Sequence, residues 1–205
     1  MDAVMLVGWL AAVVGTVLGI PQAYRLIRTR NVEGVAVSAW QVMLALNVAW
    51  LVHGVRIAQA NMVVVNALGL LSTVTILIVL SRELPRSLPR ILLPGLAVAA
   101  AMISVNFLLG GAVYGLFAAI PAVLGQLGQT AELVRAERVE GVSKVFLTMS
   151  FTNFALWTLW GFLAGDQAAF IASLATGAVA LLNVAWLGLR LSGLGPKRFL
   201  VPAFS

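Results

Sequence analysis

Two tryptophans and two small polar residues recur at one spacing in the chain. Trp50 precedes Asn66 by 16 positions, and Trp157 precedes Ser173 by the same 16 positions. An indole offers a broad apolar face, whereas an amide or a hydroxyl both donates and accepts hydrogen bonds. These groups suit the noncovalent binding of a neutral ligand that carries hydroxyl groups. Asn47 lies one helical turn before Trp50 and extends the polar stripe on that helix.

Each of these residues also has a simpler interpretation. Trp is enriched at membrane interfaces, so Trp50 can be a belt residue near the end of its span. Asn66 can hold two helices together, because amides inside a membrane bond across helix interfaces. The pattern alone does not separate a binding site from close helix packing.

The elements that must position these residues are membrane spans. The chain of 205 residues is 61% hydrophobic and 10% charged, against about 25% charged in soluble domains, and its mean hydropathy is +1.03. A span needs about 20 mostly apolar residues. The uncharged intervals are 3–24, 34–55, 57–81, 91–131, 145–165 and 167–189. The interval 91–131 is long enough for two helices, and a turn is expected at Gly110-Gly111 in its centre, which gives seven spans.

The basic residues predict the orientation of these spans. With seven spans, twelve Lys and Arg residues fall on one side and only Arg56 falls on the other. Positive charge collects on the cytoplasmic side, so we expect the N-terminus outside and the C-terminus in the cytoplasm. The pattern suits a plasma membrane protein. The net charge of +6 is therefore explained by topology, with the lipid bilayer and not nucleic acid as partner.

The chain repeats itself at a shift of 107 positions. The tetrapeptide VEGV occupies 32–35 and again 139–142. At the same shift, further identities are Gln22 with Gln129, Leu26 with Leu133, Arg28 with Arg135, Trp50 with Trp157, and Gly54 with Gly161. An extra helix between two three-helix repeats gives both repeats the same orientation. The sequence predicts an all-α integral membrane protein of seven transmembrane helices in a 3+1+3 arrangement. The expected segments are a first three-helix repeat at 1–84, linker helix four at 85–110, a second three-helix repeat at 111–192 and a cytoplasmic tail at 193–205.

The order of the short motifs resembles that of the SWEET sugar transporters, within the PQ-loop superfamily. The first repeat carries PQ at 21–22, VEGV at 32–35, WLVHG at 50–54 and NALG at 66–69. The resemblance covers nearly the whole chain. It implies facilitative (uniport) transport of neutral mono- or disaccharides by alternating access, with the sugar bound between the repeats. The sugar contacts it implies are Trp50, Asn66, Trp157 and Ser173, with Asn47 beside them.

Residues near the helix ends are expected to control access. Pro21 removes a backbone hydrogen bond and weakens its helix, and in the family this region, together with Gln22, opens the cytoplasmic side. The second repeat departs from the family with Gly128-Gln129 in place of Pro-Gln. His53 stands where the family has Tyr. It is a candidate for the outer gate, or else an interfacial His with no role.

Other function classes are disfavoured by the residue types that the sequence or its predicted spans lack. It has no cysteine, and we expect no catalytic residue, metal or cofactor, and hence no enzyme. No acidic residue falls inside a predicted span, which favours uniport over coupling to an ion gradient. The alternatives are a PQ-loop carrier of amino acids or another small metabolite, and a non-transporting membrane receptor on the same scaffold. The oligomeric state stays open, since a homo-oligomer and a monomer both fit.

Overall fold

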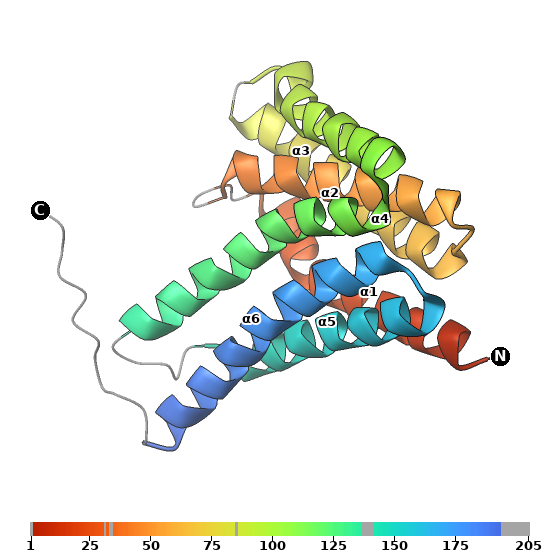
Figure 1. The fold of residues 1–205 in the computed structure, drawn as a ribbon. Helices are drawn as coiled ribbons and strands as arrows, with labels where there is room; N and C mark the ends of the chain where they lie inside the picture. The colour runs from red at the N-terminus through yellow and green to blue at the C-terminus, as the bar shows by residue number, and fades with distance from the viewer. Residues whose placement is uncertain (1, 31, 33–34, 85, 137–141, 194–205) are drawn as a thin grey trace, which may run out of the picture.

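The computed structural model describes residues 2–30, 32, 35–84, 86–136 and 142–193, with the side chains at 20–23 and 27 outside the description. These residues form six helices, shown in Figure 1: α1 (Ala3–Thr29), α2 (Val37–Arg56), α3 (Ala60–Glu83), α4 (Leu88–Arg135), α5 (Lys144–Ala164) and α6 (Gln167–Leu191). All six are long and apolar enough to cross a membrane. Both VEGV segments and most of the predicted tail lie wholly or partly outside the described residues.

The helix α4 contains 48 residues and has a break within it. Its backbone leaves helical geometry at Gly110, where φ is 83° and ψ is 175°. This region of φ favours glycine, which has no Cβ to clash with the backbone. Figure 1 shows the two parts of α4 running in different directions from this point. We call residues 88–109 the first segment of α4 and residues 111–135 its second segment.

The helices pack in a closed circuit. Going round the circuit, α1 contacts α3, α3 contacts α2, α2 contacts α4, α4 contacts α6, α6 contacts α5, and α5 returns to α1. A shift of 107 positions takes α1 to the second segment of α4, α2 to α5 and α3 to α6. The α1–α3 contact is thereby carried onto the α4–α6 contact, and the α2–α3 contact onto the α5–α6 contact.

One close helix contact occurs twice at this shift. A Cβ placed on Gly54 would lie 3.1 Å from the Cβ of Met62, where α2 meets α3. A Cβ placed on Gly161 would lie 2.5 Å from the backbone nitrogen of Phe170 and 3.1 Å from the backbone of Ala169, where α5 meets α6. Gly54 therefore allows α2 and α3 to approach closely beside the turn that joins them, and Gly161 does the same for α5 and α6.

The apolar surface faces outwards and several polar side chains face inwards. Leu71, Leu108 and Phe162 are 68%, 81% and 69% exposed, whereas Asn106 and Asn183 are fully buried. Large exposed apolar areas require a lipid or protein environment. With its apolar helices, this distribution makes the chain a membrane protein.

The bundle has two distinct ends, visible in Figure 1. The turn end carries the N-terminus, the α2–α3 turn at 57–59, Gly110 and the α5–α6 turn at 165–166. The basic end carries the opposite helix ends. Its helix-terminal basic residues include Arg28, Arg82, Arg90, Arg135 and Arg190.

Candidate functional site

The two tryptophans of the repeated spacing meet around one apolar cluster at the turn end. The cluster has Met62, Trp160 and Ala169 at its centre, and both Trp50 and Trp157 pack against it. Trp50 comes from α2 and Trp157 from α5, so the two halves of the chain contribute one indole each. The Trp157 and Trp160 rings stand edge to face, with centroids 5.5 Å apart.

The two polar residues lie one helical turn beyond the same cluster. Asn66 follows Met62 by four positions on α3, and Ser173 follows Ala169 by four positions on α6. Asn66 is half-buried, and its Nδ2 donates to the carbonyl of Met62 over 2.8 Å. Ser173 is also half-buried. Positions four apart share one helix face, so both residues lie one turn from the cluster towards the basic end.

Asn47 is placed differently, within the first half of the chain. Its Nδ2 donates to the Met43 carbonyl over 2.9 Å and to the Thr73 Oγ1 over 3.1 Å. A Cβ placed on Gly69 would overlap the Asn47 side chain. The amide therefore joins α2 to α3, which is the helix-packing role that such amides have in membranes. Its role as a sugar contact stays a prediction.

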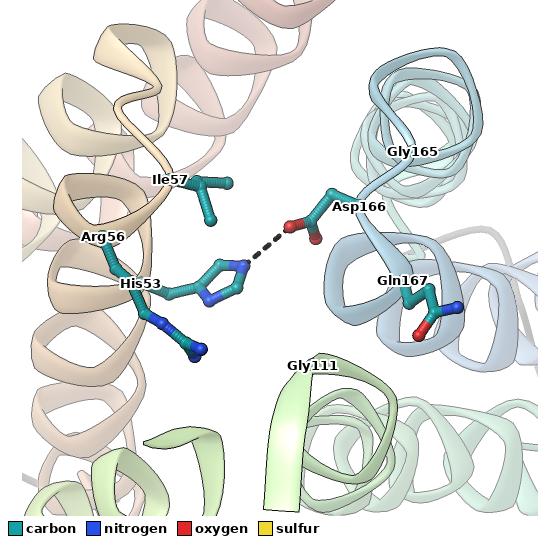
Figure 2. A pocket seen from close by; sticks show the side chains of 7 residues that line it. All are labelled: His53, Arg56, Ile57, Gly111, Gly165, Asp166 and Gln167. Atoms are coloured by element: carbon teal, nitrogen blue, oxygen red, sulfur yellow. Dashed lines mark hydrogen bonds and ion pairs between the residues drawn. The ribbon is translucent and has the colours of Figure 1, made fainter.

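His53 joins the two halves at the turn end. The ring is buried, and its Nε2 lies 2.9 Å from the Oδ2 of Asp166 (Figure 2). Its Nδ1 lies 2.9 Å from the Nδ2 of Asn106. The rings of Trp50 and Tyr114 lie beside the imidazole, with centroids 5.6 Å and 5.3 Å away. We call His53 and Asp166 the cross-pair, because α2 supplies one partner and the α5–α6 turn supplies the other.

Asp166 is also the N-cap of α6. Its Oδ1 accepts a hydrogen bond from the Ala169 amide over 2.6 Å. Burial alone would raise the pKa of the Asp166 carboxyl. The hydrogen bonds from His53 and from the Ala169 and Ala168 amides nevertheless hold that pKa below its usual value. The N-terminus of a helix favours a negative charge, so the carboxylate is well placed to stay ionised.

A cavity of about 260 Å³ opens beside the cross-pair. Figure 2 shows residues from three turns around it: Ile57 after α2, Gly111 in α4, and Gly165 and Gln167 around the α5–α6 turn. Its polar lining consists of His53, Arg56, Asp166 and Gln167. Within the described part of the chain, no group of three or more His, Cys, Asp or Glu residues is arranged to hold a metal ion.

The residues expected to control access at the basic end lie on intact helices. The backbone of α1 stays helical through Pro21 and Gln22 and ends only at Thr29. The side chains of Pro21 and Gln22 lie outside the described ones. Gly128 and Gln129 lie on the second segment of α4, and a Cβ placed on Gly128 would have no neighbour within 4 Å. Their hinge role stays a prediction.

A polar cluster that the sequence analysis missed occupies the second half. Asn183 is fully buried on α6, and its Nδ2 donates to the carbonyl oxygen and the Oε1 of Gln126. Thr130 donates to the Asn183 Oδ1 over 2.6 Å. The positions that correspond to Gln126, Thr130 and Asn183 in the first half hold Gly, Ala and Ile. A comparison of the two repeats therefore does not reveal this cluster.

Asn153 is a further polar residue that the sequence analysis did not single out. It lies one turn before Trp157 on α5, and its Oδ1 is buried without a hydrogen-bond partner among the described residues. The Oδ1 lies 3.1 Å from the Cβ position of Gly15 on α1, between the two halves. The corresponding residue of the first half is Leu46. A buried acceptor without a partner is costly, and a ligand hydroxyl would satisfy it.

The fold and this site define a polytopic, all-helical membrane protein with polar groups placed between its two halves. In sequence, the chain is 29% identical over 79 residues to a protein named sugar transporter SemiSWEET from Escherichia coli (strain UMEA 3162-1). The match covers 38% of this chain and 89% of that protein. It supports a distant relationship to SWEET-type transporters. No family model matches the chain, and no solved structure matches it.

Proposed function

We propose that the protein is a facilitative uniporter of neutral mono- or disaccharides that works by alternating access. The observation that carries the proposal is the meeting of Trp50 and Trp157, one from each half, around a single cluster. Asn66 and Ser173 follow one turn further on. Indole faces and small polar groups suit a sugar, which has apolar C–H faces and many hydroxyls. The sugar-transporter name of the E. coli relative is in keeping with this chemistry.

The proposed architecture is two parallel three-helix repeats with a linker helix between them. The first segment of α4 is the linker, and the second segment opens the second repeat. In support, 89% of the E. coli relative corresponds to only 38% of this chain. The 79 matched residues are close in number to one proposed repeat. The repeats would then enclose one sugar pathway, in a plasma membrane, with the turn end outside and the basic end in the cytoplasm.

The proposed transport cycle starts from a protein closed at the turn end. There, the His53–Asp166 contact and the packing of Trp50 and Trp157 join the two halves. At the basic end, each of the two apolar clusters formed by described residues stays within one half. One is centred on Leu26, Leu44, Ile76, Leu77, Leu80 and Ile91, and the other on Leu133, Leu147 and Leu187. A sugar would enter from the cytoplasmic side in this state, and separation of the cross-pair would release it outside.

Asn153 completes the proposed sugar site. Its Oδ1 lies between the halves, one turn from Trp157, and has no hydrogen-bond partner among the described residues. The longer Asn153 side chain would supply the second half with the polar contact that the short Ser173 side chain reaches less well. The uniport part of the proposal rests on where the acidic residues lie, because carriers driven by an ion gradient commonly have an acidic side chain inside a span. Here Glu83 and Glu132 lie near helix ends, and Asp166 lies between two helices.

The proposal is tested by uptake of a panel of labelled sugars into proteoliposomes with no imposed ion gradient. We expect saturable uptake by the wild type and at least a tenfold loss in Trp50→Ala and in Asn66→Ala. Trp9→Ala is the matched control, because Trp9 is 37% exposed on the outer surface of α1, and it should transport normally. Folded protein that takes up no sugar of the panel would overturn the assignment. The next assays would be amino acid uptake under a pH gradient and ligand binding without transport.

A further inference from the structure

Asn106 is a fully buried amide in a segment that the sequence treats only as a linker. It lies in the last turn of the first segment of α4, four positions before the break at Gly110. The residues that follow it, Phe107 and Leu108, are 57% and 81% exposed. A buried polar side chain in an otherwise apolar helix needs hydrogen-bond partners, and all of its side-chain partners come from α2.

Arg56 fixes the orientation of this amide. Its Nη1 donates to the Asn106 Oδ1 over 2.7 Å and to the Asn106 backbone oxygen over 2.8 Å. Its guanidinium also lies over the Phe107 ring, 4.9 Å from the centroid. A guanidinium can only donate, so the amide must turn its oxygen towards Arg56. The amide NH₂ group is then the one that faces His53.

The orientation of Asn106 in turn decides which nitrogen of His53 carries the proton. Because the Asn106 NH₂ donates, the His53 Nδ1 at 2.9 Å must accept. A neutral imidazole that accepts at Nδ1 carries its hydrogen on Nε2. That nitrogen faces the Oδ2 of Asp166, a carboxylate that can only accept. Each contact from Arg56 to Asp166 therefore pairs one donor with one acceptor.

We propose that Asn106 is the positioning residue of the cross-pair: it holds His53 in the Nε2–H tautomer that donates to Asp166. The first segment of α4 is thereby coupled to the contact between the two halves. A hydrogen on Nδ1 would point at the Asn106 NH₂ group, which is itself a donor, so the geometry places the ring hydrogen on Nε2. The other groups that face the ring are the Trp50 and Tyr114 side chains. The nearest cation, Arg56, acts through Asn106.

The tautomer assignment does not depend on the transported solute, whereas its effect on opening rests on the proposed function. Opening separates His53 from Asp166, and the ring then loses the acceptor that its Nε2–H requires. While Asn106 holds the ring in place, the two halves can close again without a change of tautomer. Loss of the amide would let the ring turn away from Asp166.

The test uses the fact that His53 is the only histidine in the chain. The full chain, free of any histidine tag, is labelled with ¹⁵N-histidine and reconstituted in lipid bilayers. Nitrogen NMR at neutral pH then reports the state of this ring alone. We expect the wild type to show a protonated Nε2 and a bare, hydrogen-bonded Nδ1. A protonated Nδ1 with a bare Nε2 would overturn the proposal.

Two variants separate positioning from a merely structural role. Asn106→Asp places a second carboxylate at the ring, so both ring nitrogens should become protonated. Asn106→Leu removes the donor, so the Nδ1 signal should shift towards that of a nitrogen without a hydrogen bond. Ser104→Leu is the matched control, because Ser104 is exposed on the same segment and bonds only to the Ala100 carbonyl. Spectra of both Asn106 variants that superimpose on the wild type would overturn the proposal. The expected spectra without any sugar uptake would support it and would count against the proposed function alone.

Discussion

The turn end and the basic end of the bundle are held together in different ways. At the turn end, contacts cross from one half of the chain to the other: His53 meets Asp166, and Gly8 on α1 packs on Trp160 of α5. At the basic end, the two apolar clusters of described residues each stay within one half, as does the bond from Arg190 on α6 to the carbonyl of Leu133 on α4. In the proposed transport cycle, the cross-half contacts at the turn end are the ones that must break for that end to open.

The largest expected effect comes from Gly8, where α1 reaches the turn end. A Cβ at this position would overlap the Asn61 side chain and lie 2.7 Å from the Trp160 ring, which is fully buried. Gly8→Val should therefore force the halves apart and lower the free energy of unfolding by about 3 kcal/mol, the upper part of the range for overpacking. Thermal unfolding in detergent would measure this loss.

The matched control for this prediction is Gly19→Val on the same helix. A Cβ on Gly19 has no neighbour within 4 Å, so the variant should change stability only by the small helix propensity difference between Gly and Val, which favours Val. Equal stability of the two variants would contradict the tight contact between halves at the turn end.

The next effect concerns the charge of Asp166. Asn is as good an N-cap as Asp, so Asp166→Asn keeps the α6 cap and removes the charged acceptor of His53. We expect a loss of about 1.5 kcal/mol at neutral pH, the low end of the range for a hydrogen bond to a charged group, because the Asn oxygen can still accept. Asp2→Asn is the control, because Asp2 caps α1 in the same way, through the Met5 amide at 2.8 Å, without a partner in the other half.

The pH dependence of stability follows from the lowered pKa of Asp166. A carboxyl whose pKa is lower in the folded protein stabilises it fully above the unfolded value, about 3.9 for Asp. This stabilisation is lost as the pH falls through the folded value. Acid below about pH 4 should therefore reduce the difference in melting temperature between the wild type and Asp166→Asn. A difference that stays constant down to pH 2 would show that the carboxylate charge does not hold the turn end.

A smaller effect should distinguish two asparagines, one within a half and one between halves. Asn47→Ala removes the α2–α3 hydrogen bond to Thr73 and should cost about 1 kcal/mol of stability. Asn153→Ala removes an acceptor that has no partner among the described residues. It should leave stability nearly unchanged and raise the KM for sugar several-fold. Uptake kinetics and melting curves of both variants would check the contrast, and the reverse pattern would move the sugar site towards Asn47.

The smallest expected effect is at Gly128 on the second segment of α4. Its helix is unbroken there and a Cβ would meet nothing within 4 Å. Gly128→Ala should therefore raise stability by up to about 1 kcal/mol. If Gly128 is a hinge, the same change should slow uptake at saturating sugar, and an unchanged rate would remove it from the set of gating residues.

Much of the fold could be predicted because a membrane leaves few choices. Uncharged stretches of about 20 residues must form helices there, and the glycine pair at the centre of the longest stretch predicted the break at Gly110. The spacing from Trp50 to Asn66 recurs in the second half and drew attention to the cluster where Trp50 and Trp157 meet, whose role in sugar binding stays a prediction. Exact helix ends were harder to predict, as α1 continues past Pro21 to Thr29.

The cross-pair and its supporting residue could not be predicted by comparing the repeats. Such a comparison highlights residues that recur, but Gln59 corresponds to Asp166, and Leu46 corresponds to Asn153. Asn106 lies before the second repeat and has no counterpart at all. These residues act at contacts between the halves, where the two sides can be chemically different, and only the packing of the helices brings them together.

The most direct test of alternating access is a pair of distance measurements between spin labels in lipid bilayers. The chain has no native cysteine, so labels can be placed at Ala60→Cys with Gln167→Cys for the turn end. Ser38→Cys with Val145→Cys serves the basic end. All four positions are exposed, and the two positions of each pair are related by the shift of 107. We predict that a transported sugar lengthens the turn-end distance in part of the population while it shortens the basic-end distance in the same proportion. Distances that change together at both ends, or not at all with a sugar that is transported, would contradict the account.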